Sequence, residues 1–465
     1  MTTIQHRLRT ECVRSRRYQA GVRWVLVLIG GTLGLTGCSN LLDVETPDIV
    51  VPDVLETPAG LEAQRRGAYG DFVLAFTGAA NGGGPGIDGH ISAVGLLTDE
   101  LKSSTTQFDR TQLDAREGQD RNEVSRLYYA NLQRARRAAE SAALAYDAAT
   151  EAPNRAIAQA EASALAGFTY VFFGEDFCAG VPFSSMADDG SIEFGMPTTT
   201  DEVLDLAIAR FDAAIAHAQS ASDIQHESLA RVGKARALLD KGLYAEAAGV
   251  VAAVPTNFEY TIKYSTNTDR QVNELHNEVN IQQRLTAVNA EGGNGIAFFD
   301  RYDAGDPRVP YARDPDGKAF DASVEMFFQV KYPGRDTPVP LASGIEARLI
   351  EAEAALVGQP NEFGAIHDAL RATVGLDPVD VGAMTADQRV NYHFEERATW
   401  LWLTGHRLGD MPRLISQYGR NAETVFPSGR YSRPQFVDYG TAVNLQIPVE
   451  ERNNPNFAGC TSLGA

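Results

Sequence analysis

The chain has 465 residues, of which 44% are hydrophobic and 22% are charged, and this composition is typical of a globular protein. It is too apolar for a wholly disordered chain, and its four cysteines are too few for a disulfide scaffold. The 61 acidic and 41 basic residues give a formal net charge of −20. That excess argues against a nucleic-acid partner, because a phosphate backbone attracts clustered Lys and Arg.

The first 37 residues have the organisation of an export signal. Residues 1–23 contain six arginines and a single acidic residue, and an apolar run of 12 residues follows at Trp24–Leu35. This run is shorter than the roughly 20 residues that a transmembrane helix needs, so it favours a cleaved signal peptide over residues 1–37.

The signal ends in Leu35-Thr36-Gly37-Cys38, which resembles the bacterial lipobox, where the cysteine is acylated after cleavage. We therefore predict lipidation at Cys38, with acyl chains that hold the protein on a membrane. Residues 38–58 contain three prolines among acidic residues and show no helical period, so we predict a flexible tether there. The remaining residues, 59–465, are predicted to form one domain.

The cysteines can be sorted on this basis. Cys12 is removed with the signal and Cys38 carries lipid, which leaves Cys178 and Cys460. An exported compartment is oxidising, so we predict a structural disulfide between these two. The alternative, two unpaired thiols, stays open on the sequence alone.

From Leu61 to Leu370 the dominant pattern is the 3.6-residue helical period. Thr199 and Glu202 have the spacing of a capping box, which predicts a helix that starts beside them. The predicted helices in this part and after it span 122–146, 155–173, 201–219 and 387–404.

Two segments have the pattern of helical hairpins. Within 229–255, Gly242-Leu243-Tyr244-Ala245-Glu246-Ala247 has Gly, Tyr and Ala at the spacing of a tetratricopeptide unit, and 345–373 is a second candidate. Such units bury their apolar faces only against neighbours, so we expect about four helix pairs. Segments without clean periodicity separate them, notably about 260–340 and 418–456, and their aromatic residues argue against disorder.

Several short motifs together resemble the SusD/RagB family of outer-membrane nutrient-binding lipoproteins. Beyond the lipobox they run in family order over nearly the whole chain. The most extended match is Glu396-Arg397 with Gly405, Arg407, Asp410 and Arg413. The others are Leu42-Asp43-Val44 with Pro47, Leu97-Thr98-Asp99-Glu100, Asp306-Pro307-Arg308, Arg348-Leu349-Ile350-Glu351-Ala352, and Ile447-Pro448 with Glu451 and Asn454-Pro455-Asn456.

The resemblance implies a mostly α fold: a SusD-like right-handed arrangement of about four tetratricopeptide-type helix pairs, with a loop-rich, irregular subdomain that faces the ligand. The chain departs from the family pattern where Trp400 and Thr404 replace the usual acidic residues and where His406 replaces a frequent arginine. From their chemistry, we interpret Glu396, Arg397, Arg407 and Asp410 as one structural charge network that locks helix to loop, not as ligand contacts. The three departures affect the family's local ion-pair pattern around the predicted 387–404 helix, not the fold.

Sugars offer C–H faces to aromatic rings and hydroxyl groups to charged side chains. Aromatic and charged residues stand side by side at 108–110 and 298–303, in segments outside the repeats. We therefore predict ligand contacts there, with burial in the core as the equally weighted alternative. The predicted ligand-binding residues are Phe108, Arg110, Phe299, Arg301 and Tyr302.

The sequence lacks the motifs of common enzymes. It has no His-Glu-x-x-His zinc motif, no Gly-x-Ser-x-Gly elbow and no Walker lysine followed by Ser or Thr. We therefore expect no catalytic residues, no metal site and no cofactor, and a protein that is not an enzyme.

The sequence thus predicts an exported, lipid-anchored protein, and the family resemblance implies that it sits on the outer membrane, facing the cell exterior. The family resemblance implies that it captures an oligosaccharide or peptide and delivers it to a SusC-like TonB-dependent transporter. The alternative is a tetratricopeptide scaffold on the periplasmic face that mediates protein assembly without a small ligand.

Overall fold

The computed structural model describes residues 52–187, 189–356 and 358–464, and these belong to one unit that spans Val51–Ala465. The predicted signal peptide, Cys38 and most of the predicted tether lie outside the described residues. At the end of that tether, Pro52–Leu55 form the short helix α1, and α2 (Pro58–Thr77) begins at Thr57, whose hydroxyl accepts from the backbone of Gly60.

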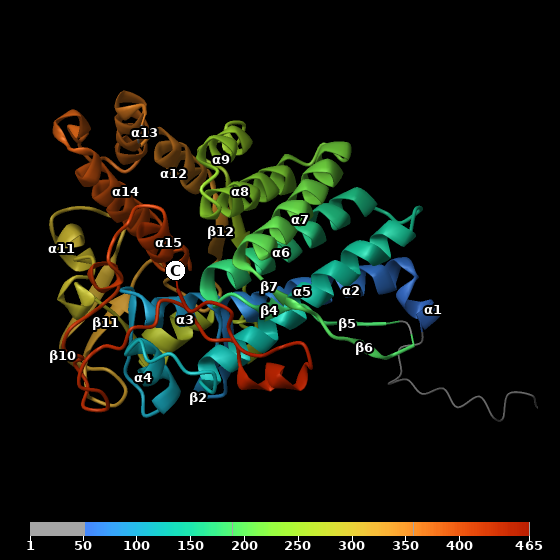
Figure 1. Ribbon diagram of the computed structural model, residues 1–465, viewed down its shortest axis with the longest axis horizontal. Helices are drawn as coiled ribbons and strands as arrows, with labels where there is room; N and C mark the ends of the chain where they lie inside the picture. The colour runs from blue at the N-terminus through green and yellow to red at the C-terminus, as the bar shows by residue number, and fades with distance from the viewer. Residues whose placement is uncertain (1–51, 188, 357, 465) are drawn as a thin grey trace, which may run out of the picture. The chain divides into compact units, whose positions relative to one another are not determined.

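Helices dominate the unit, which confirms the mostly α fold class. Consecutive long helices pack against one another, from α2 on α5 through α6, α7, α8 and α9 to α12, which contacts both α13 and α14 (Figure 1). After α2 the bounds of these helices are α5 Glu123–Ala148, α6 Arg155–Asp176, α7 Thr200–Ser220, α8 Ile224–Asp240, α9 Tyr244–Val251, α12 Gly344–Ala355, α13 Pro360–Ala372, α14 Ala386–Trp400 and α15 Arg407–Ser416.

Local sequence explains where these helices start and stop. The Thr199–Glu202 capping box at the start of α7 is present as predicted. Gly242 ends α8 with a φ of 73°, a left-handed conformation that glycine adopts without strain, and α9 starts two residues later. The prediction of a helix over 387–404 is wrong at its end. The helix stops at Trp400, because the chain turns with positive φ at Leu403 and Gly405.

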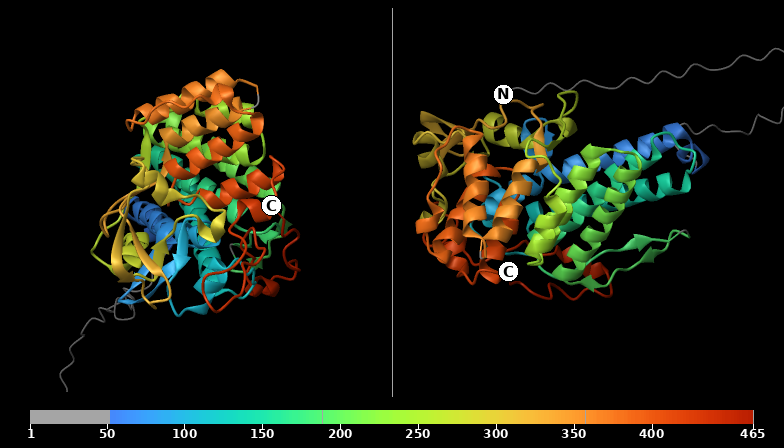
Figure 2. Two further views of the ribbon diagram at one scale, coloured as in Figure 1. Left: turned by 90° about the vertical axis from the view of Figure 1, so that its left-hand side faces the viewer. Right: turned by 90° about the horizontal axis from the view of Figure 1, so that it is seen from above.

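The segments that lack a helical period hold short strands and short helices. In Figures 1 and 2 most of them gather on the side away from α8, α9 and α13. Their helical parts are α3 His90–Leu97, α4 Phe108–Asp114, η1 Asp269–Gln271, α10 Glu274–His276, η2 Asn277–Ile281, η3 Glu291–Gly293, α11 Phe298–Asp303, η4 Val381–Ala383, α16 Ala422–Val425 and η5 Val449–Asn453.

The strands of the described residues pair two by two and antiparallel: β1 (Gly78–Asn81) with β2 (Gly84–Asp88), β3 (Leu101–Ser103) with β9 (Leu285–Ala287), β4 (Val181–Pro182) with β7 (Pro197–Thr198), β5 (Ser185–Met186) with β6 (Ile192–Glu193), β8 (Glu259–Ile262) with β12 (Val339–Ser343), and β10 (Tyr311–Lys318) with β11 (Glu325–Gln329). Most are too short to leave an alternating pattern in the sequence.

One large apolar core runs through both parts. It joins aromatic side chains of the helices, such as Phe72, Phe172 and Phe211, to residues of the irregular segments, such as Phe298 and Met326. The shared core makes the loop-rich part continuous with the helical part. Across the described ranges, every helix is too short or too polar to cross a membrane.

Candidate functional site

An aromatic patch surrounds α11, where three of the predicted ligand residues lie. Tyr302 is 37% exposed, and its ring meets the ring of Tyr311 edge to face at 5.6 Å. Tyr311 stacks on Phe299 at 4.0 Å, and the ring of Phe327 lies 4.9 Å from that of Phe299. We call Tyr302, Tyr311 and Phe327 the Tyr302 patch.

Charged groups hold and border the Tyr302 patch. The hydroxyl of Tyr311 donates to the carboxylate of Asp303 at 3.0 Å, and burial together with this carboxylate raises the pKa of Tyr311. Arg313 lies over the ring of Phe327, 5.6 Å from its centroid, and pairs with Glu325. A fixed aromatic surface with carboxylate and guanidinium groups at its edge can hold a ligand with apolar faces and hydroxyl groups.

Arg301 points to a neighbouring groove. Its guanidinium donates to Glu395 of α14 at 2.5 Å, and Glu395 lines a groove of about 390 Å³. Asn294, Asn391 and Arg420 add polar groups to the walls of this groove. The structure therefore connects one predicted ligand residue to a polar groove at the junction of the loop-rich part and α14.

Phe108 lies elsewhere, at the first position of α4. It is 54% exposed, and its ring packs 5.6 Å from that of Phe436 in the C-terminal segment. The structure thus leaves Phe108 and Tyr302 accessible, on separate short helices, and shows no contact between them.

Two of the predicted ligand residues are internal. Arg110 is fully buried, with its guanidinium 2.8 Å from Asp88 and 2.6 Å from Glu278, so it is an internal cation and the prediction of a ligand contact is wrong. Phe299 is 3% exposed beneath Tyr311 and supports the patch from below. Sequence reasoning missed Tyr311 and Phe327 as patch residues, although both stand in an aromatic-rich segment.

The four residues of the predicted charge network are all buried, but they form separate clusters. Arg397 of α14 pairs with Asp410 of α15 at 2.9 Å, and Arg413 donates to the same carboxylate at 2.7 Å. Burial opposes ionisation of Asp410, yet the two arginines hold its pKa well below its ordinary value. This cluster locks one helix to another.

The other two predicted members reach into the loop-rich part. Glu396 accepts from Arg308 at 2.6 Å and from Arg371 at 3.0 Å, while Arg407 donates to both oxygens of Asp99 at 2.7 and 2.9 Å. The four residues are therefore buried ion-pair partners as predicted, but they form separate clusters and not one network. Glu396 and Arg407 join different segments to α14 and α15.

Cys178 and Cys460, the two cysteines that we predicted to pair, are joined by a disulfide with their Cα atoms 5.7 Å apart. It fixes the C-terminal segment beside the end of α6, where the amide of Thr461 also donates to the carbonyl of Ala179 at 2.8 Å. That segment therefore belongs to the folded body.

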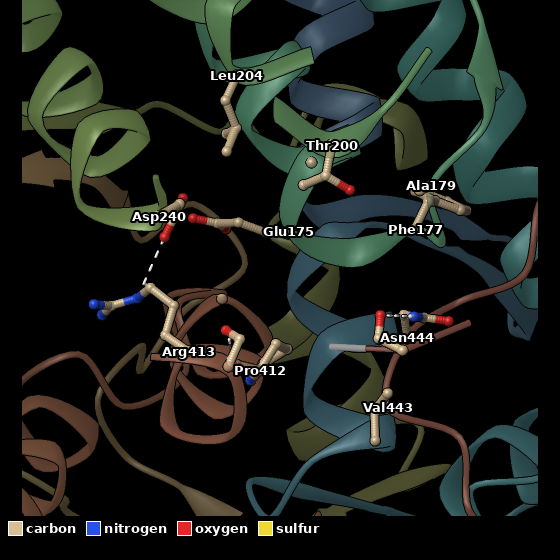
Figure 3. Close-up of a pocket in the computed structure, with 14 residues that line it drawn as sticks. Glu175, Phe177, Ala179, Thr200, Leu204, Asp240, Pro412, Arg413, Val443 and Asn444 are labelled. Carbon is tan, nitrogen blue, oxygen red and sulfur yellow. Dashed lines mark hydrogen bonds and ion pairs between the residues drawn. The ribbon is translucent and has the colours of Figure 1, made fainter. Parts of the chain in front are cut away.

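A small polar cavity lies next to this segment (Figure 3). Glu175, Asp240 and Arg413 line one side of it, and Arg413 lies 3.3 Å from Asp240. On the other side the side-chain amide of Asn444 donates to the carbonyl of Gly464. At about 100 Å³ the cavity can hold water but not an oligosaccharide.

A larger groove of about 610 Å³ lies where α2, α6, α8 and β8 meet, with Tyr69 and Tyr260 among its lining residues. Among its charged lining residues, Arg65 contacts both Glu62 and Glu161. In the described part of the chain, no group of three or more His, Cys, Asp or Glu residues is placed to hold a metal ion.

Comparison with known proteins identifies the fold. No protein-family model matches the chain, and no curated protein matches it. Solved structures do. A SusD superfamily protein from Bacteroides vulgatus aligns with a TM-score of 0.64 at 13% identity, and surface glycan-binding protein A from Bacteroides uniformis with 0.66 at 14%. Each alignment covers 87% of this chain and 99% of the other.

The chain has the SusD fold. A laminarin-binding SusD-like protein also aligns, with a TM-score of 0.55 at 16% identity over 87% of this chain and 99% of the other. The resemblance stated from the sequence motifs is thereby confirmed at the level of the fold. Within this example of the SusD fold, the motif residues Asp99 and Arg308 form buried ion pairs with residues far away in the sequence, and Asp410 forms one with Arg397 of the preceding helix α14.

Proposed function

We propose that this protein captures an oligosaccharide on its loop-rich side, as a lipid-anchored component of an outer-membrane nutrient-uptake system. The observation that carries the proposal is the Tyr302 patch, a supported aromatic surface with charged groups at its edge. Two of the solved structures with the same fold are a surface glycan-binding protein and a laminarin-binding protein. Their named ligands support a glycan over a peptide for this chain.

Capture at such a patch is reversible binding. The flat face of a pyranose ring stacks on an exposed tyrosine, and its hydroxyl groups exchange hydrogen bonds with neighbouring charged groups. Tyr302 offers the exposed ring, while Asp303 and Arg313 offer the charges. On this proposal the protein holds a glycan and breaks no bond.

The test is isothermal titration of the folded protein against a panel of soluble plant, algal and host glycans. Tyr302→Ala should weaken binding of the recognised glycan by about twofold to tenfold, since an aromatic contact contributes about 0.5–1.5 kcal/mol. Phe194→Ala is the matched control, because Phe194 is also an exposed aromatic residue but lies far along the chain from the patch. If wild type binds peptides and no glycan, the ligand class is wrong.

The anchor and the delivery step are also part of the proposal. With Cys38 acylated, the protein stays at the outer surface and passes its ligand to a SusC-like TonB-dependent transporter. Protease treatment of intact cells should therefore degrade it, and Cys38→Ala should release it from the membrane. A chain that intact cells protect from protease, and that binds no small ligand, would instead support the periplasmic scaffold.

A further inference from the structure

The polar groove beside α14 adjoins the Tyr302 patch through one ion pair. Arg301, the residue before Tyr302 in α11, donates to Glu395 of α14 at 2.5 Å, and Glu395 lines this groove of about 390 Å³. Figure 1 shows α11 next to α14. We call it the α14 groove. Its volume is within the roughly 300–1,000 Å³ of small-ligand pockets, so it has room for part of a ligand that also contacts the patch.

The lining of the α14 groove is apolar at its base and polar at its edge. The buried and partly buried apolar side chains that line it are Ile296, Phe394, Leu414 and Val425. Two exposed polar residues, Asn391 and Thr424, line it as well. Asn391 accepts from Arg420 at 3.1 Å through Oδ1, and within the described part of the chain its NH₂ group has no partner. An apolar base with polar groups around it matches the C–H faces and hydroxyl groups of a sugar.

The charged groups that line the α14 groove are already paired. Glu395 has its arginine in α11. Arg420 lies 3.3 Å from the carboxylate of Asp387, and Arg407 donates to both oxygens of Asp99 at 2.7 and 2.9 Å. Since each lining charge has an opposite charge beside it, the groove offers no excess charge of either sign. An acidic sugar would compete with these carboxylates for the arginines, in a chain whose formal net charge is −20.

Two guanidinium nitrogens of the α14 groove still lack acceptors. Nη1 of Arg407 and Nε of Arg420 have no hydrogen-bond partner among the described residues, and both nitrogens are buried. A buried N–H group without a partner costs free energy, so an acceptor near it is favoured. The hydroxyl oxygens of a sugar are acceptors that carry no charge. They therefore suit these two nitrogens without opposing the carboxylates nearby.

We infer that the α14 groove is a second subsite for the glycan, and that it selects an uncharged oligosaccharide long enough to reach it from Tyr302. This inference rests on the proposed function and adds to it the charge and the length of the ligand. One sugar unit stacks on Tyr302. The units that follow cross Arg301 and place their hydroxyl groups against Asn391 and Arg420. A short sugar occupies one of the two subsites and leaves the other empty.

The test is isothermal titration of the folded protein with size series from disaccharide to hexamer. The neutral series are gluco-, manno- and xylo-oligosaccharides, and the acidic series is oligogalacturonides. Asn391→Trp fills the groove from an exposed position of α14, and Asn391→Ala removes the amide. Asn257→Trp is the matched control, because Asn257 is exposed in the turn between α9 and β8 and does not line the groove. Thermal unfolding of each variant checks that it folds.

Wild type should bind one neutral series with an affinity that rises about tenfold from disaccharide to hexamer, and should bind oligogalacturonides at least tenfold more weakly. Asn391→Trp should remove the gain with length and keep the affinity for the disaccharide. Asn391→Ala should lose part of the gain, and Asn257→Trp should keep all of it. Tyr302→Ala should weaken binding at every length, because it acts on the patch.

Two results would overturn the inference and leave the proposed function intact. Equal affinity of Asn391→Trp and wild type for the hexamer would show that the glycan does not enter the groove. Tighter binding of oligogalacturonides than of every neutral series would show that the site selects acidic sugars. A wild type that binds no glycan in any series would overturn the proposed function, and this inference with it.

Discussion

Single buried acids connect parts of this chain that are far apart in sequence. Asp99 and Glu100 are neighbours at the end of the segment that follows α3, and both reach the C-terminal third. Asp99 accepts from Arg407, while Glu100 accepts from the backbone amide of Leu403 at 2.8 Å. The two acids differ in their partners: Asp99 faces a cation, and Glu100 faces a neutral amide in a fully buried position.

This difference predicts an unusual pH dependence of stability. Burial, opposed by the hydrogen bond from Leu403, raises the pKa of Glu100 from 4.5 to about 7. The folded state therefore holds this proton between those pH values while the unfolded state releases it. The stabilisation is present below pH 4.5 and is lost as pH rises through 7. At about 1.4 kcal/mol per pH unit, it amounts to about 3 kcal/mol.

Glu100→Gln should remove that part of the pH dependence, because the amide keeps an acceptor for Leu403 and cannot ionise. The measurement is the free energy of unfolding in urea at pH 5 and pH 8. The loss of this free energy between pH 5 and pH 8 should be about 2–3 kcal/mol smaller in the variant than in wild type. Glu450→Gln, at an exposed position, should behave as wild type. An unchanged difference in the Glu100 variant would show that Glu100 ionises normally in the folded state.

At the scale of elements, the long helices pack closely where one of them carries glycine. Phe211 of α7 lies against Gly233 of α8, and a Cβ built on Gly233 would meet the Phe211 ring at 2.3 Å. The same ring lies against Gly167 of α6. A single phenylalanine thus occupies the space that two glycines leave on either side of it.

Gly233→Ala should therefore destabilise the protein by about 1–3 kcal/mol, the usual cost of an overpacked core. Gly249→Ala is the matched control, because Gly249 lies inside α9 with no atom within 4 Å of a built Cβ. That variant should gain about 0.5–1 kcal/mol from the higher helix propensity of alanine. Chemical denaturation of both variants measures the difference. Equal effects of the two substitutions would mean that α7 and α8 do not pack as described.

The elements that sequence predicted well are those with a repeating pattern. The period of 3.6 residues gave α5, α6 and α7 to within three residues at either end. The short strands gave no such pattern.

The prediction of the ligand-binding residues was partly wrong, because it rested on which residue types stand together and not on a repeating pattern. Phe108 and Arg110 are two positions apart on one short helix, so they point in different directions, one to solvent and one into the core. Composition alone does not distinguish them.

At the scale of the whole molecule, the C-terminal segment is fastened back to the folded body near the end of α6. The disulfide spans 282 positions between Cys178 and Cys460, and Cys178 is buried in the core at the end of α6. Around it, Asn444 donates to the carbonyl of Leu463 at 3.2 Å. The disulfide therefore adds a covalent link to a segment that long-range hydrogen bonds also hold, among them those from Cys178 to Leu445 and from Thr461 to Ala179.

Cys460→Ala should lower the free energy of unfolding by about 2–5 kcal/mol, because the unfolded chain is no longer constrained over so long a loop. Hydrogen exchange at Thr461, whose amide donates to Ala179, should become faster at the same time. Denaturation of wild type with a strong reductant should reproduce the variant. A wild type that reductant leaves unchanged would mean that the two thiols are unpaired in the exported protein. Glycan binding at the Tyr302 patch should persist in the variant, since no residue of the patch contacts the segment that the substitution frees.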